Sequence, residues 1–197
     1  MTVRVVLATH NAHKVTEFQR ILAGGIPGLE IVSYDGPEPV EDGVTFAENA
    51  LIKARVAAAH TGLPALADDS GICVDVLGGA PGIFSARWSG RHGDDRANLQ
   101  LLLDQLADVP DAHRGAHFSC AIALVVGEDE STVEGVWPGA LAREVRGANG
   151  FGYDPVFLPD GEGGASAAEL APERKSAVSH RARAFGLITP LLAALPR

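Results

Sequence analysis

Hydrophobic and polar positions in the first part of the chain alternate between a strand pattern and a helix pattern. Residues 3–8 form an almost continuous apolar run and residues 30–34 a shorter one, so both predict strands. Residues 12–23 lie between them and place apolar side chains at helical spacing, with Gly24-Gly25 as the expected end of the helix. This strand–helix–strand order favours an α/β fold.

The next segment predicts a second helix that leads toward two adjacent acids. Residues 45–61 have helical spacing, and Gly62-Leu63-Pro64 is the expected end of this helix. Thr45 opens the pattern of a capping box, whose side chains satisfy free backbone N–H groups. Apolar residues at 65–67 and 72–76 predict two strand pieces, separated by Asp68-Asp69-Ser70-Gly71.

The rest of the chain predicts strands in the middle and helix at the end. Strands are expected over 117–126, 131–136, 140–146 and 156–158, and helices over 94–106 and most of 176–195. Strands that follow one another without helices indicate an antiparallel or mixed part of the sheet. The sequence therefore predicts an α/β fold in which helices flank a mixed β-sheet, built as a single domain over residues 1–197.

Composition and charge exclude several classes of protein. Hydrophobic residues make up 46% of the chain, yet no run reaches the ~18 uncharged apolar residues of a membrane helix. The N-terminal sequence lacks the layout of a signal peptide, so we expect a cytoplasmic protein that does not bind membranes. A net charge of −9 argues against binding to nucleic acid, although converging cations and a metal could still hold a small polyanion. Cys73 and Cys120 lie in apolar runs and are expected to be buried free thiols.

The first candidate site is the junction between the first strand and the first helix, Thr9-His10-Asn11-Ala12-His13-Lys14. The start of a helix offers free N–H groups and a partial positive charge, which suit a phosphate, and Lys14 adds a full charge. Thr9 and Asn11 could bind phosphate oxygens, but Asn11 could equally cap the helix while Lys14 is solvated. The glycines of a Walker A loop or a dinucleotide-binding fingerprint are absent.

The adjacent acids Asp68 and Asp69 are the clearest candidates for metal chemistry. Their apolar lead-in predicts carboxylates at the end of a buried strand, where α/β sheets hold their sites. Neighbouring strand residues point to opposite faces, so one acid should enter the site while the other orients the loop or metal waters. Carboxylates suit Mg²⁺, and one near the metal can act as a general base toward water. Glu41 joins them only if it approaches the other acids; otherwise it favours the dipole of the following helix.

Three further groups of polar residues suit a nucleotide, and each also has a structural explanation. Asn49 and Lys53 share a face of the helix over 45–61, which favours a site over a solvated lysine. In the segment 150–155 an aromatic ring could stack on a base, or the glycines could simply form a tight turn around a core aromatic. The segment 175–181 could hold a phosphate or a keto oxygen, or could be an ordinary basic helix face.

Taken in order, these segments resemble the inosine/xanthosine triphosphate pyrophosphatases, the Ham1-like or RdgB-like family. The resemblance runs from about residue 3 to residue 192 and rests on several segments at compatible spacings, none specific alone. These are Thr9-x-Asn11-x-x-Lys14, the acid-to-lysine stretch 41–54, and segments 67–71, 78–87, 150–155 and 179–181. The resemblance implies an elongated mixed sheet with two lobes, an active cleft between the lobes, and a homodimer.

The resemblance also implies a reaction and a set of site residues. Water attacks the α-phosphate of ITP, dITP or XTP in the presence of Mg²⁺, and the monophosphate and pyrophosphate are released. Asp69 is then the general base and a metal ligand, Glu41 is the second acid at the metal, and Asp68 lies beside them. The implied substrate-binding residues are Thr9, His10, Asn11, Ala12, His13, Lys14, Lys53, Ser70 and Lys175 for the triphosphate, and Phe151, Gly152, Tyr153, Asp154, His180 and Arg181 for the purine.

One departure from the family pattern and two rival functions accompany this interpretation. His10 stands where the family usually has glycine, so its side chain could narrow the phosphate loop or contact phosphate. A Maf-like pyrophosphatase for other modified nucleotides would use the same acids and lysines with a different base pocket. A nucleotide sensor would bind triphosphate without hydrolysing it. The acids and lysines are all present, which favours an enzyme.

Overall fold

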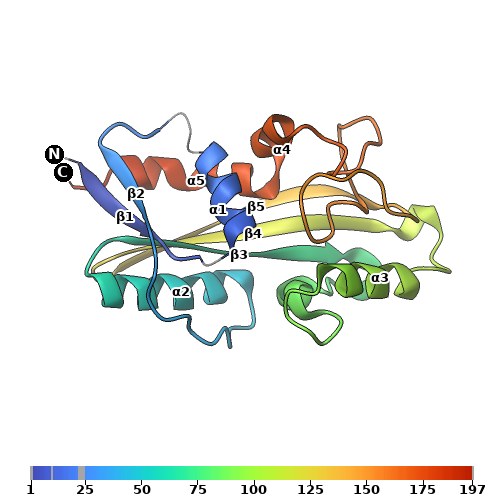
Figure 1. Ribbon diagram of the computed structural model, residues 1–197, viewed down its shortest axis with the longest axis horizontal. Helices are drawn as coiled ribbons and strands as arrows, with labels where there is room; N and C mark the ends of the chain where they lie inside the picture. The colour runs from blue at the N-terminus through green and yellow to red at the C-terminus, as the bar shows by residue number, and fades with distance from the viewer. Residues whose placement is uncertain (1, 10, 22–24, 197) are drawn as a thin grey trace. The chain divides into compact units, whose positions relative to one another are not determined.

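The protein is described by a computed structural model that covers residues 2–9, 11–21 and 25–196, arranged in two compact units. Within these residues six strands form one sheet in the order β2-β1-β3-β4-β5-β6 (Figure 1). Their bounds are β1 Val3–Leu7, β2 Leu29–Ser33, β3 Ala65–Val74, β4 Gly115–Val126, β5 Asp129–Leu141 and β6 Phe157–Pro159. β1 pairs in parallel with β2 and β3, whereas β5 and β6 are antiparallel, so the predicted mixed sheet is confirmed.

The chain passes between the two units within β3, β4 and β5, and again between His180 and Arg181. The first unit comprises Met1–Asp69, Cys120–Gly135 and Arg181–Arg197, and the second comprises Ser70–Ser119 and Val136–His180. The helices of the first unit are α1 (Ala12–Ile21), α2 (Phe46–Thr61) and α5 (His180–Ala193), and those of the second are α3 (Asp95–Gln105) and α4 (Pro172–Val178). The predicted helix over 12–23 is described from Ala12 to Ile21, and residues 22–24 lie outside the described part of the chain.

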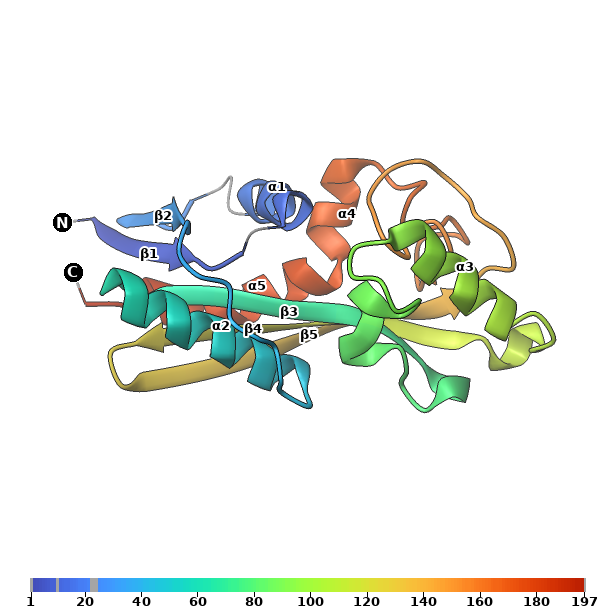
Figure 2. The ribbon, with the colours of Figure 1, turned by 60° about the horizontal axis from the view of Figure 1, so that its bottom comes forward.

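Alternate strand residues in the first unit face two separate hydrophobic clusters. Leu66 of β3 packs with Phe18 of α1 and Phe185 of α5, whereas Ala65 and Ala67 belong to the cluster that contains α2. Figures 1 and 2 show α1 and α5 on one side of the strands and α2 on the other. Because side chains alternate along a strand, the even and odd positions of β3 meet different helices.

Helix α2 begins and ends where the sequence predicts. The hydroxyl of Thr45 accepts a hydrogen bond from the backbone N–H of Glu48 at 3.1 Å, and the Glu48 carboxylate accepts from Val44 N at 2.7 Å. This is a capping box whose second bond reaches one residue further back than usual. Gly62 ends the helix with φ 68°, a left-handed conformation that glycine adopts at no steric cost. The buried face of the helix consists of small residues and one amide: Asn49, Ala50, Ala54 and Ala57.

The second unit has its own core around Trp137 and Phe157. The rings of these residues meet edge to face with centroids 5.3 Å apart, and Phe118 contacts Phe157 in the same way at 4.8 Å. Helix α3 adds Leu102 to this core and starts at Asp94, whose carboxylate accepts from Ala97 N at 3.1 Å. These contacts support the segments that carry the predicted purine-binding residues of this unit.

The predicted interruption around Asp68 and Asp69 is wrong, because β3 runs unbroken from Ala65 to Val74. The acids therefore lie within the strand rather than at its end. The strand can continue because cationic side chains from the helices on both faces lie close to the acids. Gly71 allows the 3₁₀ helix η3 (Gly82–Arg87) to approach, since a Cβ at position 71 would collide with Ser85 Oγ.

Two other predicted element boundaries also need correction. The strands expected over 131–136 and 140–146 form the single strand β5, which passes through Pro138 and ends at Leu141. Proline has no backbone N–H to donate, but the carbonyl of Pro138 still accepts a hydrogen bond from Asp160 N at 3.0 Å. The helix expected over 176–195 is divided at Ser179, which has extended dihedrals of φ −66° and ψ 166°. Serine favours such positions because its hydroxyl bonds to nearby backbone groups.

The burial of both cysteines agrees with the prediction from the sequence. Cys73 and Cys120 are both free and buried, as predicted. Burial raises the pKa of the Cys120 thiol far above its ordinary value, and the charge of Asp68 raises it further. Among the described helices, none is long and apolar enough to cross a bilayer.

Candidate functional site

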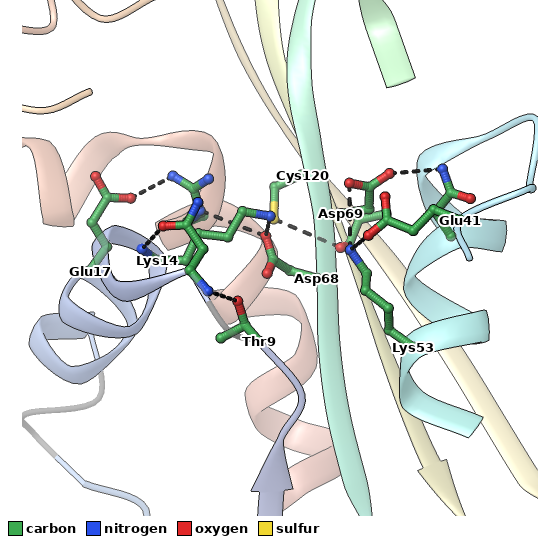
Figure 3. A network of polar contacts seen from close by, with 12 residues as sticks. Thr9, Lys14, Glu17, Glu41, Lys53, Asp68, Asp69 and Cys120 are labelled. Carbon is green, nitrogen blue, oxygen red and sulfur yellow. Dashed lines mark hydrogen bonds and ion pairs between the residues drawn. The ribbon is translucent and has the colours of Figure 1, made fainter. Parts of the chain in front are cut away.

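The two acids of β3 point to opposite faces of the strand, as their adjacent positions predict. Figure 3 shows Asp68 turned toward Lys14 and Asp69 turned toward Lys53 and Glu41. Asp68 shares the face of Leu66, which packs under α1 and α5, whereas Asp69 shares the face of the alanines under α2. Each acid therefore belongs to a separate cluster of charged groups within the first unit.

The cluster around Asp69 joins two acids to one lysine. Lys53 Nζ lies 2.7 Å from Glu41 Oε1 and 3.7 Å from Asp69 Oδ1. Asn49 donates its amide hydrogen to the other oxygen of Asp69, with Nδ2 3.1 Å from Oδ2. Lys53 and Asn49 lie one turn apart on α2, so the helix presents a cation and a hydrogen-bond donor to the same carboxylate.

Burial leaves the Asp69 carboxyl easier to protonate than an ordinary aspartate. Burial raises the pKa of the Asp69 carboxyl, the charge of Glu41 adds to the increase, and Lys53 offsets it only in part. Burial by itself lowers the pKa of Lys53, but Asp69, Asp68 and Glu41 together outweigh burial and raise it. The site therefore combines a lysine that stays charged with a carboxylate of increased basicity, a combination that suits proton abstraction beside a polyanion.

The cluster around Asp68 is a closely compensated network of opposite charges. Lys14 Nζ donates to Asp68 Oδ2 at 2.8 Å, and Arg181 Nε lies 3.8 Å from the same oxygen. Arg181 also donates to the carboxylate of Glu17, one turn beyond Lys14 on α1. Burial alone would raise the pKa of Asp68, but the charges of Lys14 and Arg181 outweigh it and hold the pKa below its usual range.

The junction between β1 and α1 forms a capped helix start. Asn11 Oδ1 accepts from Lys14 N at 3.2 Å, so Asn11 caps the helix, which was one of the two roles considered for it. Asn11 N in turn donates to Thr9 Oγ1 at 3.2 Å. Thr9 also lines a mainly apolar cavity of about 270 Å³ beneath α1, together with Phe18 and Ile31. His10 lies outside the described residues, and Ala12 and His13 are described only as backbone positions of α1.

The second unit brings three of the predicted residues together. Asp154 Oδ2 accepts from Lys175 Nζ at 2.6 Å and from the backbone N–H of Phe151 at 2.8 Å. Lys175 Nζ also lies 5.2 Å from the centre of the Phe151 ring, a cation–π contact. A Cβ at Gly150 would collide with the Asp154 carboxylate, so glycine is required where the loop closes on itself. Asp154 therefore holds the conformation of the loop over 150–155. Its predicted contact with a base is not tested by these bonds.

The other predicted residues of the second unit are held by packing. Tyr153 is buried and donates to the carbonyl of Ser85 at 2.9 Å, and burial strongly raises the pKa of its hydroxyl. The ring of His180 stacks on Phe118, with centroids 4.7 Å apart and planes 13° from parallel. Ser70 follows Asp69 in β3 and is half-buried. The assignment of Tyr153 and His180 to a purine site, and of Ser70 to the triphosphate, stays a prediction.

Three residues that hold the site were not among the predicted ligands. Glu17 forms an ion pair with Arg181. The only sequence feature that could have indicated its role is its position one turn after Lys14, on the same helix. Asn49 was noted for its shared face with Lys53, but its bond to Asp69 was not foreseen. Asp95, at the first turn of α3, accepts from Gly152 N at 3.0 Å, and no sequence pattern indicated this contact.

The Asp69 cluster fits a hard divalent cation. No group of three or more His, Cys, Asp or Glu side chains in the described part of the chain has a metal-binding arrangement. Glu41 and Asp69 nevertheless converge on one positive charge, the ammonium of Lys53. Mg²⁺ usually takes one or two protein carboxylates and completes its shell with waters and substrate phosphates, so two carboxylates are enough when a triphosphate is bound.

Comparison with known proteins identifies the family of this chain. The model of the Ham1 family matches residues 5–190. The chain belongs to the Ham1 family. Among curated relatives, the dITP/XTP pyrophosphatase of Leifsonia xyli is 69% identical over 196 residues, which cover 99% of this chain and 98% of the relative. The dITP/XTP pyrophosphatase of Streptomyces avermitilis is 58% identical over 194 residues, which cover 96% of each chain.

Solved Ham1-family structures share the fold. A HAM1 protein from Coxiella burnetii aligns with a TM-score of 0.88 at 41% identity, over 98% of this chain and 100% of that one. A nucleoside-triphosphatase / dITP/XTP pyrophosphatase from Mycobacterium abscessus aligns with a TM-score of 0.77 at 52% identity, over 96% and 100% of the chains. The α/β fold predicted from the sequence is therefore that of the Ham1 family.

Proposed function

We propose that this Ham1-family protein hydrolyses noncanonical purine nucleoside triphosphates such as ITP, dITP and XTP to the monophosphate and pyrophosphate. The observation that carries the proposal is the convergence of Glu41 and Asp69 on the ammonium of Lys53, at 2.7 Å and 3.7 Å from its Nζ. Full-length relatives named dITP/XTP pyrophosphatase support the choice of substrate. The reaction cleanses the nucleotide pool of altered purines.

In the proposed mechanism Asp69 is the general base. A water molecule that attacks the α-phosphate must lose a proton, and a carboxylate with a raised pKa accepts a proton more readily. Asn49 holds one oxygen of Asp69, which leaves the other oxygen facing Lys53 and the approaching substrate. Lys53 remains protonated and stabilises negative charge that develops on the phosphate oxygens.

Glu41 and Asp69 are the residues that would hold Mg²⁺. Bound there with the substrate, the ion would neutralise phosphate charge and polarise a phosphoryl oxygen. Lys53 contacts both acids in the protein alone, and its single charge offsets theirs only in part. Asp68, which the sequence also suggested as a metal ligand, is assigned instead to anchoring Lys14 and Arg181.

The remaining predicted ligands divide between the triphosphate and the base. Cations and helix-start groups suit the triphosphate: Thr9, His10, Asn11, Ala12, His13, Lys14, Lys53, Ser70 and Lys175. The aromatic and polar groups of segments 150–155 and 179–181 suit a 6-keto purine: Phe151, Gly152, Tyr153, Asp154, His180 and Arg181. Donors aimed at the keto oxygen would be left unpaired by the amino group of adenine, which is the source of selectivity.

We further propose that the protein acts as a cytoplasmic homodimer, as the family resemblance implies. Sedimentation equilibrium of the purified protein tests the homodimer, because the molar mass of a dimer is twice that of the chain. A monomer at the concentrations used for the assay would remove the homodimer from the proposal and leave the reaction intact.

The test of function is pyrophosphate release from a panel of triphosphates, with Mg²⁺ and then with EDTA. We expect Mg²⁺-dependent release from ITP, dITP and XTP, with little from ATP or GTP. Preference for modified pyrimidine nucleotides would keep the chemistry and replace the purine assignment, as in a Maf-like enzyme. Binding without release from any substrate would contradict the hydrolase and support a nucleotide sensor.

A further inference from the structure

Asn49 is a fully buried amide that bonds to both acid-bearing segments of the Asp69 cluster. Its Nδ2 donates to Asp69 Oδ2 at 3.1 Å, and its Oδ1 accepts from the backbone N–H of Gly43 at 2.9 Å. No solvent reaches its side chain. Gly43 is two residues beyond Glu41, so one amide fixes β3 and the loop that carries Glu41 at the same time.

The contacts form a closed circuit around the proposed metal position. From Asn49 the path runs through Asp69 to Lys53, from Lys53 to Glu41, and along the loop through Gly43 back to Asn49. The loop lies so close to the amide that a Cβ on Gly43 would come within 2.7 Å of Asn49 Oδ1. Glycine at this position is therefore part of the same arrangement.

We propose that Asn49 is a positioning residue that sets the separation and orientation of Glu41 and Asp69 for a divalent cation. The proposal rests on the proposed function, which assigns the cation to these two acids. Asn49 itself does not bind the metal: its donor faces a carboxylate oxygen, and its acceptor is occupied by Gly43. Groups that hydrogen-bond to metal ligands in this way commonly change metal affinity 10–100-fold when removed.

The second unit supplies a matched comparison. Asn98 follows the capping residue Asp94 of α3 by four positions, as Asn49 follows Thr45 of α2. It is also buried, its Oδ1 accepts from Ser89 N at 2.7 Å, and its Nδ2 donates to the carbonyl of Ala86 at 3.1 Å. Both amides therefore tie a loop to a helix, but only Asn49 donates to a carboxylate of the proposed site.

The experiment compares Mn²⁺ binding in Asn49→Ala and Asn98→Ala, with Mn²⁺ alone and then with the Mn²⁺–pyrophosphate complex. Bound Mn²⁺ is followed by electron paramagnetic resonance, and thermal unfolding is recorded for every variant. We expect Asn49→Ala to weaken Mn²⁺ binding about 10-fold or more, and Asn98→Ala to leave it within about twofold despite a comparable loss of stability.

Gly43→Ala keeps the test informative if Asn49→Ala does not fold. Its added Cβ displaces the loop from Asn49 while leaving the buried amide in place, so Mn²⁺ binding should weaken here too. Gly186→Ala is its control, because a Cβ at Gly186 of α5 meets no atom within 4 Å.

The outcomes separate this inference from the proposed function. Glu41→Gln and Asp69→Asn report on the metal site itself, and both should weaken Mn²⁺ binding. If they do so while folded Asn49→Ala and Gly43→Ala bind as wild type, Asn49 has no positioning role. An equal loss in Asn98→Ala would also overturn the inference, because the effect would then be general destabilisation. Unchanged binding in Glu41→Gln and Asp69→Asn would instead reject the metal site.

Discussion

Asp68 and Asp69 are neighbours in one strand and have opposite electrostatic environments. Asp68 is surrounded by the cations Lys14 and Arg181, and its pKa lies below the usual range. Asp69 meets a second acid and shares one lysine with it, and its pKa is raised. Both carboxylates are buried, so the difference comes from the partners that each face of the strand provides.

This difference in environment separates an acid that stabilises the folded state from an acid that can react. An ionised acid with matched cations lowers the free energy of the folded state and gains little from accepting a proton. An ionised acid without enough cations raises that free energy, and is ready to accept a proton or a metal ion. The comparison therefore supports the proposed division of roles, in which Asp68 holds the cations of α1 and α5 and Asp69 takes part in the chemistry.

The largest effect is expected for Asp69→Asn. The change removes the proposed base and one metal ligand, so kcat/KM for ITP should fall roughly 10³-fold or more while triphosphate binding is retained. The melting temperature should stay the same or rise, because the ionised carboxylate of raised pKa no longer has to be buried. Steady-state kinetics, equilibrium binding and thermal unfolding measure the three quantities.

Asp42→Asn is the matched control for charge removal, since Asp42 is exposed and lies beside Glu41 in the sequence. It should keep nearly all activity. If Asp69→Asn turned over ITP at the wild-type rate, the division of roles between the two acids would be wrong.

The second effect is a loss of stability in Asp68→Asn. The change leaves the buried Arg181 and the half-buried Lys14 without the carboxylate that both face. Breaking a buried pair by removing one partner costs about 3 kcal/mol or more. For a chain of this size that lowers the melting temperature by roughly 6–12 °C. Activity should fall less than in Asp69→Asn, and a stable but inactive Asp68→Asn protein would reverse the assignment.

The third effect is the pH dependence of these stability differences. The lowered pKa of Asp68 stabilises the folded state above the unfolded pKa of about 4, and this contribution is lost as the pH falls through the folded value. The advantage of wild type over Asp68→Asn should therefore be full at pH 7 and shrink below about pH 4.

Asp69 should show the opposite trend. Its raised pKa means that ionisation costs stability once the pH exceeds the unfolded value. The melting temperature of wild type relative to Asp69→Asn should therefore fall as the pH rises from about 4 through the raised pKa. Thermal unfolding of the metal-free proteins over this pH range measures both trends, and parallel curves for the two variants would contradict the comparison.

The sequence predicts local features of this fold well. The capping pattern at Thr45 and the glycine at position 62 locate α2, because both act through contacts within a few residues. The adjacency of Asp68 and Asp69 predicts that they face opposite sides, because side-chain direction alternates along any strand. These inferences need only backbone geometry.

The sequence does not reveal which partners each acid meets. Glu17 and Arg181 are 164 positions apart, and Lys14 and Asp68 are 54 apart, so only the packing of α1 against α5 and β3 brings them together. The interruption predicted in β3 has the same origin. Two acids suggest a turn when their counter-ions are unknown, whereas a continuous strand is stable once cations cover both faces.

The smallest effect is expected at an exposed ion pair of the first unit, where Arg55 donates to both oxygens of Glu130 at 2.6 Å. The arginine side chain is 54% exposed and the glutamate 35%, so water already screens the pair. Glu130→Gln should therefore change the melting temperature far less than Asp68→Asn. At about 1 M salt, where the screening length is near 3 Å, its effect should disappear, while that of Asp68→Asn persists because buried charges are screened much less. Equal losses in the two variants, measured by thermal unfolding at low and high salt, would show that pairing rather than burial sets the stability of these charges, and would remove the physical basis for separating Asp68 from Asp69.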